Sequence, residues 1–186
     1  MKKYIYTVML ILMGITVTQA QRMLPGQKGL EVSTGVLSNG KIGNDYHINM
    51  GMTVNSKKGN YQLWGAEYTH RYHHYKDIHI LQETYTAEGG YSLFLLGDAR
   101  KNITLNAAIT GVVGYESVNQ GESLLYDGAK IASKDHFIYG AGGRITFETY
   151  LSDRFVLLLQ GRTKILWGTD LSQFRPSAGL GLRFNF

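Results

Sequence analysis

The sequence lacks cysteine, and proline occurs only twice in its 186 residues. Without cysteine, the chain can form no disulfide and can carry no lipid-modified cysteine as an anchor. Proline removes a backbone donor and is kept out of sheet interiors, so its scarcity fits long strands. Beyond about residue 20, no apolar run reaches the roughly 20 residues that a transmembrane helix needs. These absences exclude a disulfide-built fold and a helical membrane domain in the rest of the chain.

The chain also lacks a large net charge of either sign. The chain has 19 Lys and Arg against 14 Asp and Glu, a formal net charge of +5. These basic residues are dispersed, whereas a nucleic-acid-binding face needs them clustered. The glycine-rich run at residues 140–143 is not a phosphate loop, because it lies within a predicted strand and no helix follows it. We therefore expect no direct binding of nucleic acid and no cofactor.

The first residues have the composition of a secretory signal peptide. Lys2 and Lys3 precede an apolar run over residues 5–17, and the small residues Thr18 and Ala20 occupy the −3 and −1 positions of a cleavage site. A retained membrane anchor is the weaker interpretation, because the apolar run is shorter than a spanning helix. We predict that residues 1–20 are removed, which lowers the net charge from +5 to +3.

The most informative pattern in the sequence is in the last nine residues, where apolar side chains fall on every second position. One face of this segment carries only apolar residues, and the other carries glycine and polar residues. The apolar face consists of Ala178, Leu180, Leu182, Phe184 and Phe186, and the other face of Gly179, Gly181, Arg183 and Asn185. A strand between lipid and a polar lumen requires this alternation, which is typical of the closing strand of an outer-membrane β-barrel.

The same alternation predicts eight strands, near residues 28–37, 46–55, 60–72, 78–96, 102–115, 136–150, 154–167 and 176–186. Short connections follow the second, fourth and sixth strands, and longer ones follow the others, the longest spanning residues 116–135. Bacterial barrels with both termini in the periplasm sort their loops in this way.

We therefore predict an all-β fold, a transmembrane antiparallel up-and-down β-barrel of eight strands with a side-chain-filled lumen, over residues 28–186. Residues 21–27 form a periplasmic lead-in, and lipid of the outer membrane of a Gram-negative cell surrounds the barrel. A ten-stranded variant stays open if residues 78–96 or 116–135 contain another hairpin. The oligomeric state is not predicted.

Charged residues of both signs fall on the inward face of the predicted strands. An unpaired buried ion costs several kcal/mol, so these side chains are expected to pair and to fill the lumen. An eight-stranded barrel is just wide enough for such filling, which excludes a channel for DNA or ordinary solutes. The predicted network contains Glu67, Arg71, Arg144, Glu148, Arg162, Lys164 and Arg183.

Aromatic residues near the predicted strand ends are expected to form the two girdles at the membrane interfaces. They are Tyr61, Trp64, Tyr72, Tyr115, Tyr150, Trp167, Phe184 and Phe186.

Four histidines, His70, His73, His74 and His79, are close enough in sequence to suggest a metal site. Strand geometry sends His70 and His73 to opposite faces, and no cysteine or paired carboxylate completes a ligand set. We expect a hydrated outer loop between the third and fourth strands and no metal.

A lipid-modifying barrel enzyme would need a nucleophile and a base near the outer rim. Ser117, Ser123, Asp135 and His136 are in that region, but no nucleophile-elbow signature surrounds them. The interpretation of these residues as solvated loop is preferred, and we expect no enzymatic activity.

Two segments carry a family resemblance. The segment 21–32, with Arg22-Met-Leu-Pro-Gly-Gln-Lys-Gly29 at its centre, and the ending Pro176–Phe186 resemble the TraO family of conjugative-transposon transfer proteins. The resemblance implies an outer-membrane component of a conjugation (type IV secretion-like) apparatus, with other conjugal transfer proteins as partners and no catalytic residues. Within the lead-in, Arg22, Pro25, Gln27 and Lys28 are the candidates for partner docking. The alternative is a general outer-membrane protein for envelope structure or surface ligand binding.

Overall fold

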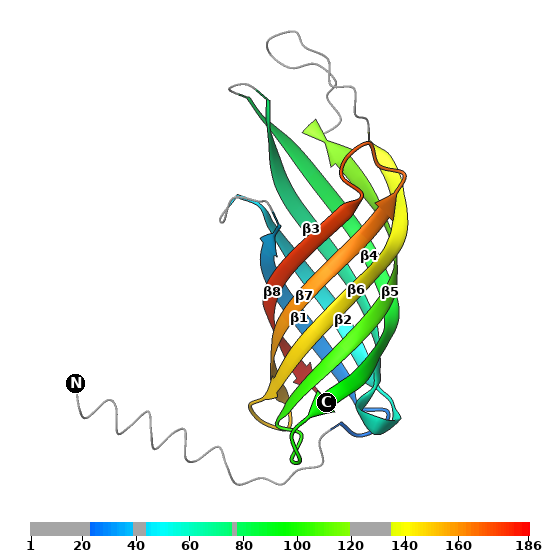
Figure 1. Ribbon diagram of the computed structural model, residues 1–186, viewed down its shortest axis with the longest axis vertical. Coiled ribbons are helices and arrows are strands. Elements are labelled where there is room, and N and C mark those ends of the chain that lie inside the picture. Colours follow the sequence, from blue (N-terminus) through cyan, green and yellow to red (C-terminus); the bar gives the residue numbers. More distant parts are fainter. Residues whose placement is uncertain (1–22, 39–43, 76–77, 120–134) are drawn as a thin grey trace, which may run out of the picture.

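The protein forms one closed barrel of eight antiparallel strands (Figure 1). The computed structural model describes residues 23–38, 44–75, 78–119 and 135–186. Each strand pairs with its neighbours in sequence, and the first pairs with the last. The strands are β1 (Lys28–Leu37), β2 (Tyr46–Asn55), β3 (Tyr61–Tyr75), β4 (Ile78–Gly97), β5 (Ile103–Val118), β6 (His136–Tyr150), β7 (Phe155–Trp167) and β8 (Phe174–Asn185).

This architecture confirms the predicted eight-stranded up-and-down barrel over the described residues. A short 3-10 turn, η1 (Lys57–Gly59), is the one helical element of the described chain. None of the described helices has the length and apolar character needed to span a membrane.

The two ends of the barrel differ in their connections. We call one the turn end: it holds the short connections 56–60, 98–102 and 151–154, and the C-terminus lies there too (Figure 1). Lys28 and Phe186 exchange backbone hydrogen bonds at this end, with N···O distances of 3.2 and 2.8 Å. The opposite, loop end holds the connections 38–45, 76–77, 119–135 and 168–173.

The predicted hydrated loop between the third and fourth strands is wrong. The β3–β4 ladder continues to the pair Tyr75–Ile78, and both strands rise above their neighbours at the loop end (Figure 1). His70, His73 and His74 are therefore strand residues, and His74 is in register with His79. Backbone hydrogen bonds hold an antiparallel hairpin together even where its side chains no longer alternate in polarity, so the pattern missed this extension.

The outer face of the wall is apolar, and the inner face is polar. On β2, Ile48, Met50 and Met52 are exposed, whereas His47 and Asn49 are buried in the lumen. β6, β7 and β8 repeat the alternation, with the inward and outward positions that the sequence predicts. A wall with such an apolar outer surface is suited to contact with lipid rather than water.

Apolar side chains close the lumen near its turn end. Met23, from the segment before β1, is buried there with Tyr150, Val156 and Leu158, and Phe94 packs against them. A second apolar layer, nearer the loop end, consists of Val112, Ile138 and Leu166.

Glycines in β6 keep the wall tight beside the second apolar layer. A Cβ on Gly140 would lie 2.0 Å from the Ile165 carbonyl oxygen, and one on Gly142 would lie 2.5 Å from the Thr110 hydroxyl oxygen. Only glycine allows neighbouring groups to approach so closely.

Candidate functional site

Eight charged side chains meet in the middle of the lumen and form one continuous series of ion pairs, which we call the ion chain. Carboxylates and cations alternate along it, four of each, and successive partners are 2.5 to 3.1 Å apart. All eight side chains are buried. In order, the ion chain consists of Glu148, Arg183, Glu31, Arg144, Glu88, Arg162, Glu67 and Lys164.

The ion chain joins walls of the barrel that are not adjacent in the sheet. Its cations come from β6, β7 and β8, and three of its carboxylates come from β1, β3 and β4. Arg162 on β7, for example, donates to Glu67 on β3 and to Glu88 on β4. Because each buried ion has an opposite charge within contact distance, the cost of removing it from water is offset. The ion chain thus braces the barrel across its lumen.

Neutral donors complete the environment of the carboxylates. The Tyr61 hydroxyl donates to Glu148 at 2.8 Å, and the Gln160 amide donates to Glu31 at 2.7 Å. The Arg183 guanidinium also lies over the Tyr61 ring, 4.5 Å from its centroid. This cation–π contact and the hydrogen bonds fix the geometry of the ion chain near the turn end.

Two of the aromatics predicted for the membrane girdles lie in the lumen instead. Tyr61 is 1% exposed and Tyr150 is 6% exposed, and both hydroxyls donate to Glu148. A buried carboxylate needs donors, and this requirement places the two rings inside. Other members of the predicted set do face outward and are exposed: Trp64, Tyr115, Trp167, Phe184 and Phe186.

Of the seven residues predicted for the lumen network, six are in the ion chain. Arg71 is not: it lies half-buried near the loop end, where its guanidinium donates to the Ser38 carbonyl at 3.4 Å. Sequence reasoning missed Glu31 and Glu88, which connect the arginines to one another. The alternation contained the signal for Glu31, because Leu30 and Val32 on either side of it face outward.

A separate polar cluster lies nearer the loop end. Glu116 is fully buried and accepts from Arg175 at 2.6 Å, from Gln82 at 2.7 Å and from Thr169 at 2.5 Å. The sequence predicts residue 116 as the start of a loop, but β5 continues to Val118 and turns Glu116 into the lumen.

The described part of the lead-in, residues 23–27, packs against the turn end. The Gly26 N–H donates to the Asn55 carbonyl at 2.7 Å, and the Asn55 side-chain amide donates to Gln27 at 3.2 Å. Pro25 and Lys28 are exposed, whereas Arg22 lies outside the described residues. Docking candidates Pro25 and Lys28 are therefore accessible at the turn end.

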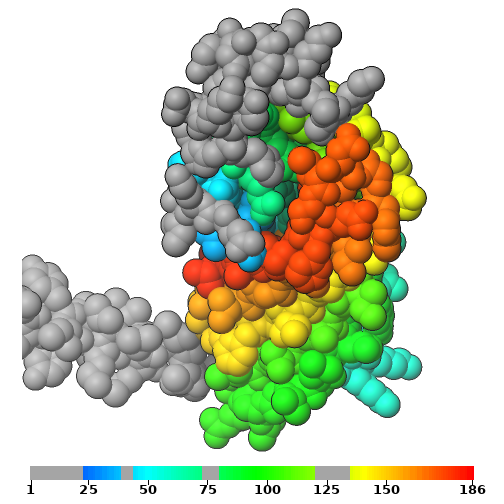
Figure 2. Space-filling model, turned by 45° about the horizontal axis from the view of Figure 1, so that its top comes forward, coloured from blue at the N-terminus to red at the C-terminus, as the bar shows by residue number. Residues whose placement is uncertain are grey.

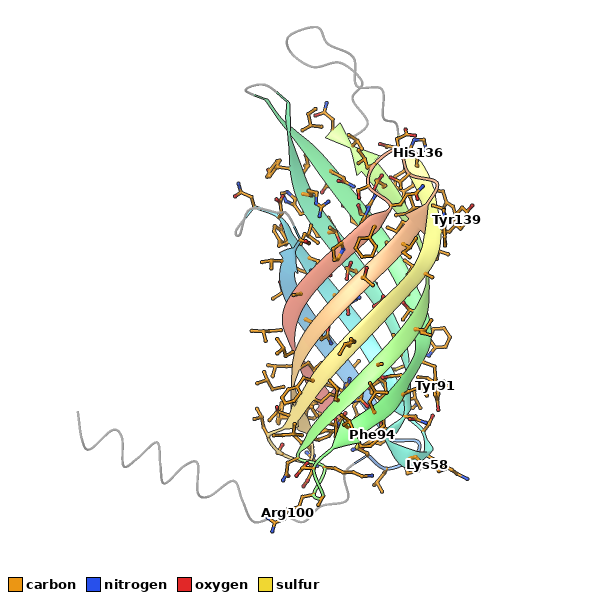
Figure 3. The ribbon with its side chains drawn as sticks, viewed as in Figure 1. Lys58, Tyr91, Phe94, Arg100, His136 and Tyr139 are labelled. Carbon is orange, nitrogen blue, oxygen red and sulfur yellow. The ribbon has the colours of Figure 1, made fainter. Side chains whose placement is uncertain are left out.

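The described residues among those considered for catalysis form contacts other than a serine–histidine pair. His136 lies at the loop end (Figure 3), and its Nε2 is 2.7 Å from an Asp170 carboxylate oxygen. Asp135 accepts from the Tyr115 hydroxyl at 3.0 Å. In the described chain no serine hydroxyl contacts His136, and Ser123 lies outside it.

The described residues also contain no group of three or more His, Cys, Asp or Glu side chains placed to hold a metal ion. The His70 ring stacks on Tyr46, with 5.0 Å between centroids, and its Nδ1 lies 3.1 Å from the Asn44 carbonyl oxygen. The side chains of His73, His74 and His79 lie outside the described part.

A closed eight-stranded barrel with an apolar outer face and a charge-filled lumen belongs to the class of small β-barrels of the outer-membrane type. Residues 24–186 match the family described as conjugative transposon protein TraO. The chain belongs to this family. No protein of curated function matches it.

Three solved structures share the fold. Neisserial surface protein A is 13% identical, with 86% of this chain and 95% of that chain covered and a TM-score of 0.55. The N-terminal β-barrel domain of Pseudomonas aeruginosa OprF is 10% identical, with coverage of 87% and 98% and a TM-score of 0.54. Ail, the attachment invasion locus protein of Yersinia pestis, is 12% identical, with coverage of 88% and 100% and a TM-score of 0.53. At these identities the likeness concerns the fold.

Proposed function

We propose that the protein is a non-enzymatic outer-membrane component of a conjugative DNA-transfer apparatus, with a scaffold or docking role. Membership of the conjugative transposon family supports the link to transfer. The apolar outer face supports a place in lipid, and the short connections support a periplasmic position for the turn end. A cleaved signal peptide would deliver the chain to that membrane.

The ion chain is the observation that carries the scaffold role. It crosses the lumen with side chains from six of the eight strands, and apolar layers lie on either side of it. A filled lumen of this kind leaves no path for DNA or protein. The barrel therefore acts through its surfaces and not as a conduit.

The turn end offers the surface for docking. Its described basic residues are all exposed, and two of them, Lys58 and Arg100, point away from the wall (Figure 3). Acidic residues are fewer there: Asp98 and Asp153. The Ile103 N–H donates to Asp98 at 2.9 Å and holds the pKa of that carboxyl below its ordinary value. The basic turn end consists of Lys28, Lys57, Lys58, Arg100, Lys101 and Arg154.

Such a surface fits an acidic patch on a periplasmic partner, because charge complementarity steers association and fixes orientation. Other conjugal transfer proteins are the proposed partners. Pro25, Gln27 and Lys28 of the lead-in lie on the same end and would contribute to the contact, as would Arg22.

Transfer frequency from a donor with a clean in-frame deletion tests the proposal. We expect a loss of transfer that a plasmid copy restores, with the protein found in the outer-membrane fraction. Normal transfer from the deletion strain would reject a role in the apparatus and leave a general envelope protein as the better description.

Charge reversal tests the docking surface. Lys57→Glu, Arg100→Glu and Lys101→Glu together should abolish co-purification with other transfer proteins while the barrel still folds. The matched control keeps the charge, with Lys57→Arg, Arg100→Lys and Lys101→Arg, and should co-purify normally. Equal recovery of partners by both variants would show that docking does not depend on this charge.

Electrical recording in a planar bilayer tests the filled lumen. The purified barrel should give no steady ion conductance, because the ion chain leaves no continuous water path. Reproducible open-channel steps from a monomer would refute the scaffold argument.

A further inference from the structure

The loop end of the lumen contains a cavity that neither the ion chain nor the docking surface uses. Its volume is about 430 Å³, including the part that is open to solvent, and Leu37 and Leu166 form apolar sections of its wall. Figure 2 turns this end toward the viewer and shows a hollow between the cyan and green atoms of β2 and β3 and the orange-red connection from β7 to β8. The ion chain closes the cavity below, so a ligand enters from the loop side.

Three cations from three different strands line this cavity: Arg71 on β3, Lys164 on β7 and Arg175 on β8. Lys164 is neutralised by Glu67 at 2.7 Å, and Arg175 by Glu116 at 2.6 Å. Glu67 is the one acidic residue of the lining, and it is already shared with Arg162. The cavity therefore has an excess of positive charge over the negative charge that its lining supplies.

Arg71 supplies that excess. No described carboxylate forms an ion pair with it, and its one hydrogen bond is the 3.4 Å contact with the Ser38 carbonyl. The positive charge of Arg175 repels Arg71, and the negative charges of Asp45 and Glu116 attract it. Asp45 accepts a hydrogen bond from the Tyr72 N–H at 2.8 Å. An anion placed between Arg71 and Arg175 would convert their repulsion into two attractive contacts.

We propose that this cavity is a binding site for a phosphate group, held by Arg71 and Arg175 with Lys164 below them. The Arg71 guanidinium presents paired N–H donors that match the oxygens of a tetrahedral oxyanion. Arg175 already donates to Glu116, Thr84, Thr169 and the Ser172 carbonyl, so it contributes mainly its positive charge. The hydroxyl of Ser177 in the lining supplies a further donor. The group arrives either as free phosphate or on a saccharide at the cell surface, because both present the same chemistry to the site.

Titration of the full mature barrel in a nonionic, phosphate-free detergent tests the site. Inorganic phosphate, added at constant ionic strength against chloride, should bind saturably in calorimetry. Arg71→Gln should weaken that binding by at least about tenfold, because a charge-assisted contact is lost. Arg71→Lys keeps the charge but not the paired donors. Its phosphate affinity should lie between that of the unchanged protein and that of Arg71→Gln.

Arg100→Gln is the matched control, since it removes the same charge from the exposed turn end and should leave phosphate affinity within about twofold. Absence of saturable binding to the folded protein, or an equal loss in both variants, would overturn the proposal. A hexose phosphate separates the sources. Tighter binding than inorganic phosphate would support a saccharide-borne group, and equal binding would support the free ion.

Discussion

The middle of the lumen and its loop end contain similar residues but balance their charges differently. In the ion chain each charged group touches at least one opposite charge, and the four carboxylates match the four cations. At the loop end Arg175 pairs with Glu116, whereas among the described residues Arg71 contacts a backbone carbonyl and no carboxylate. In a closed set the charges compensate one another, and the set serves the fold. An open set costs stability unless something completes it, so the loop end is where binding is to be sought.

Glu31→Gln should break the closed region most severely. Glu31 lies between Arg144 and Arg183 and contacts both, at 2.9 and 3.1 Å. The neutral amide leaves one of the two buried guanidinium charges uncompensated. We expect this to lower the free energy of unfolding by about 3–5 kcal/mol. Urea unfolding in detergent, followed by the fluorescence of Trp64 and Trp167, measures the change.

Glu83→Gln provides the matched control for that substitution. Glu83 is on the outward face of β4, where it accepts from the Tyr68 hydroxyl at 2.6 Å, and an amide oxygen can accept the same bond. The expected change is within about 0.5 kcal/mol. If Glu31→Gln and Glu83→Gln lower the free energy of unfolding by similar amounts, a carboxylate of the ion chain stabilises the fold no more than a carboxylate on the outer face does.

Lys164→Met tests the end of the ion chain and should have a smaller effect. Its ammonium group contacts Glu67 at 2.7 Å and the Thr86 hydroxyl at 3.0 Å, and Glu67 keeps Arg162 after the change. We expect a loss of about 1–3 kcal/mol in the same unfolding experiment. We expect the smaller loss because Lys164 is at the end of the ion chain and has one ionic partner, whereas Glu31 has two. A loss as large as that of Glu31→Gln would contradict this expectation.

The strands and their faces were predictable because one physical rule governs both. A wall between lipid and a polar lumen forces a period of two, which a single sequence reveals. The rule places Arg144 and Arg162 in the lumen and Ile145 and Gly161 outside, as the structure has them. It does not say which inward charges are neighbours, since pairs such as Glu31 and Arg183 are far apart in sequence and meet only when β1 closes on β8.

The errors occur where the rule no longer applies. The third strand is predicted to end at residue 72, but the β3–β4 ladder continues to the pair Tyr75–Ile78, where the side chains no longer alternate in polarity. The sequence predicts Tyr61 in a girdle because aromatic residues are enriched at membrane interfaces, but its hydroxyl donates to Glu148 in the lumen. The position of a residue in the alternation along its strand therefore predicts whether it faces lipid or lumen better than its aromatic character does.

Arg71→Gln is the mildest change and separates the open region from the closed one. It removes a cation that has no carboxylate partner in the described chain and that Arg175 repels, so the free energy of unfolding should stay within about 0.5 kcal/mol. Arg175→Gln at the same end should cost about 1–3 kcal/mol, because it leaves the buried Glu116 without its cation. Urea unfolding of the two variants side by side, in phosphate-free detergent, gives the difference. If Arg71→Gln is as destabilising as Arg175→Gln, Arg71 is a structural residue, and the loop end is closed in the same sense as the middle of the lumen.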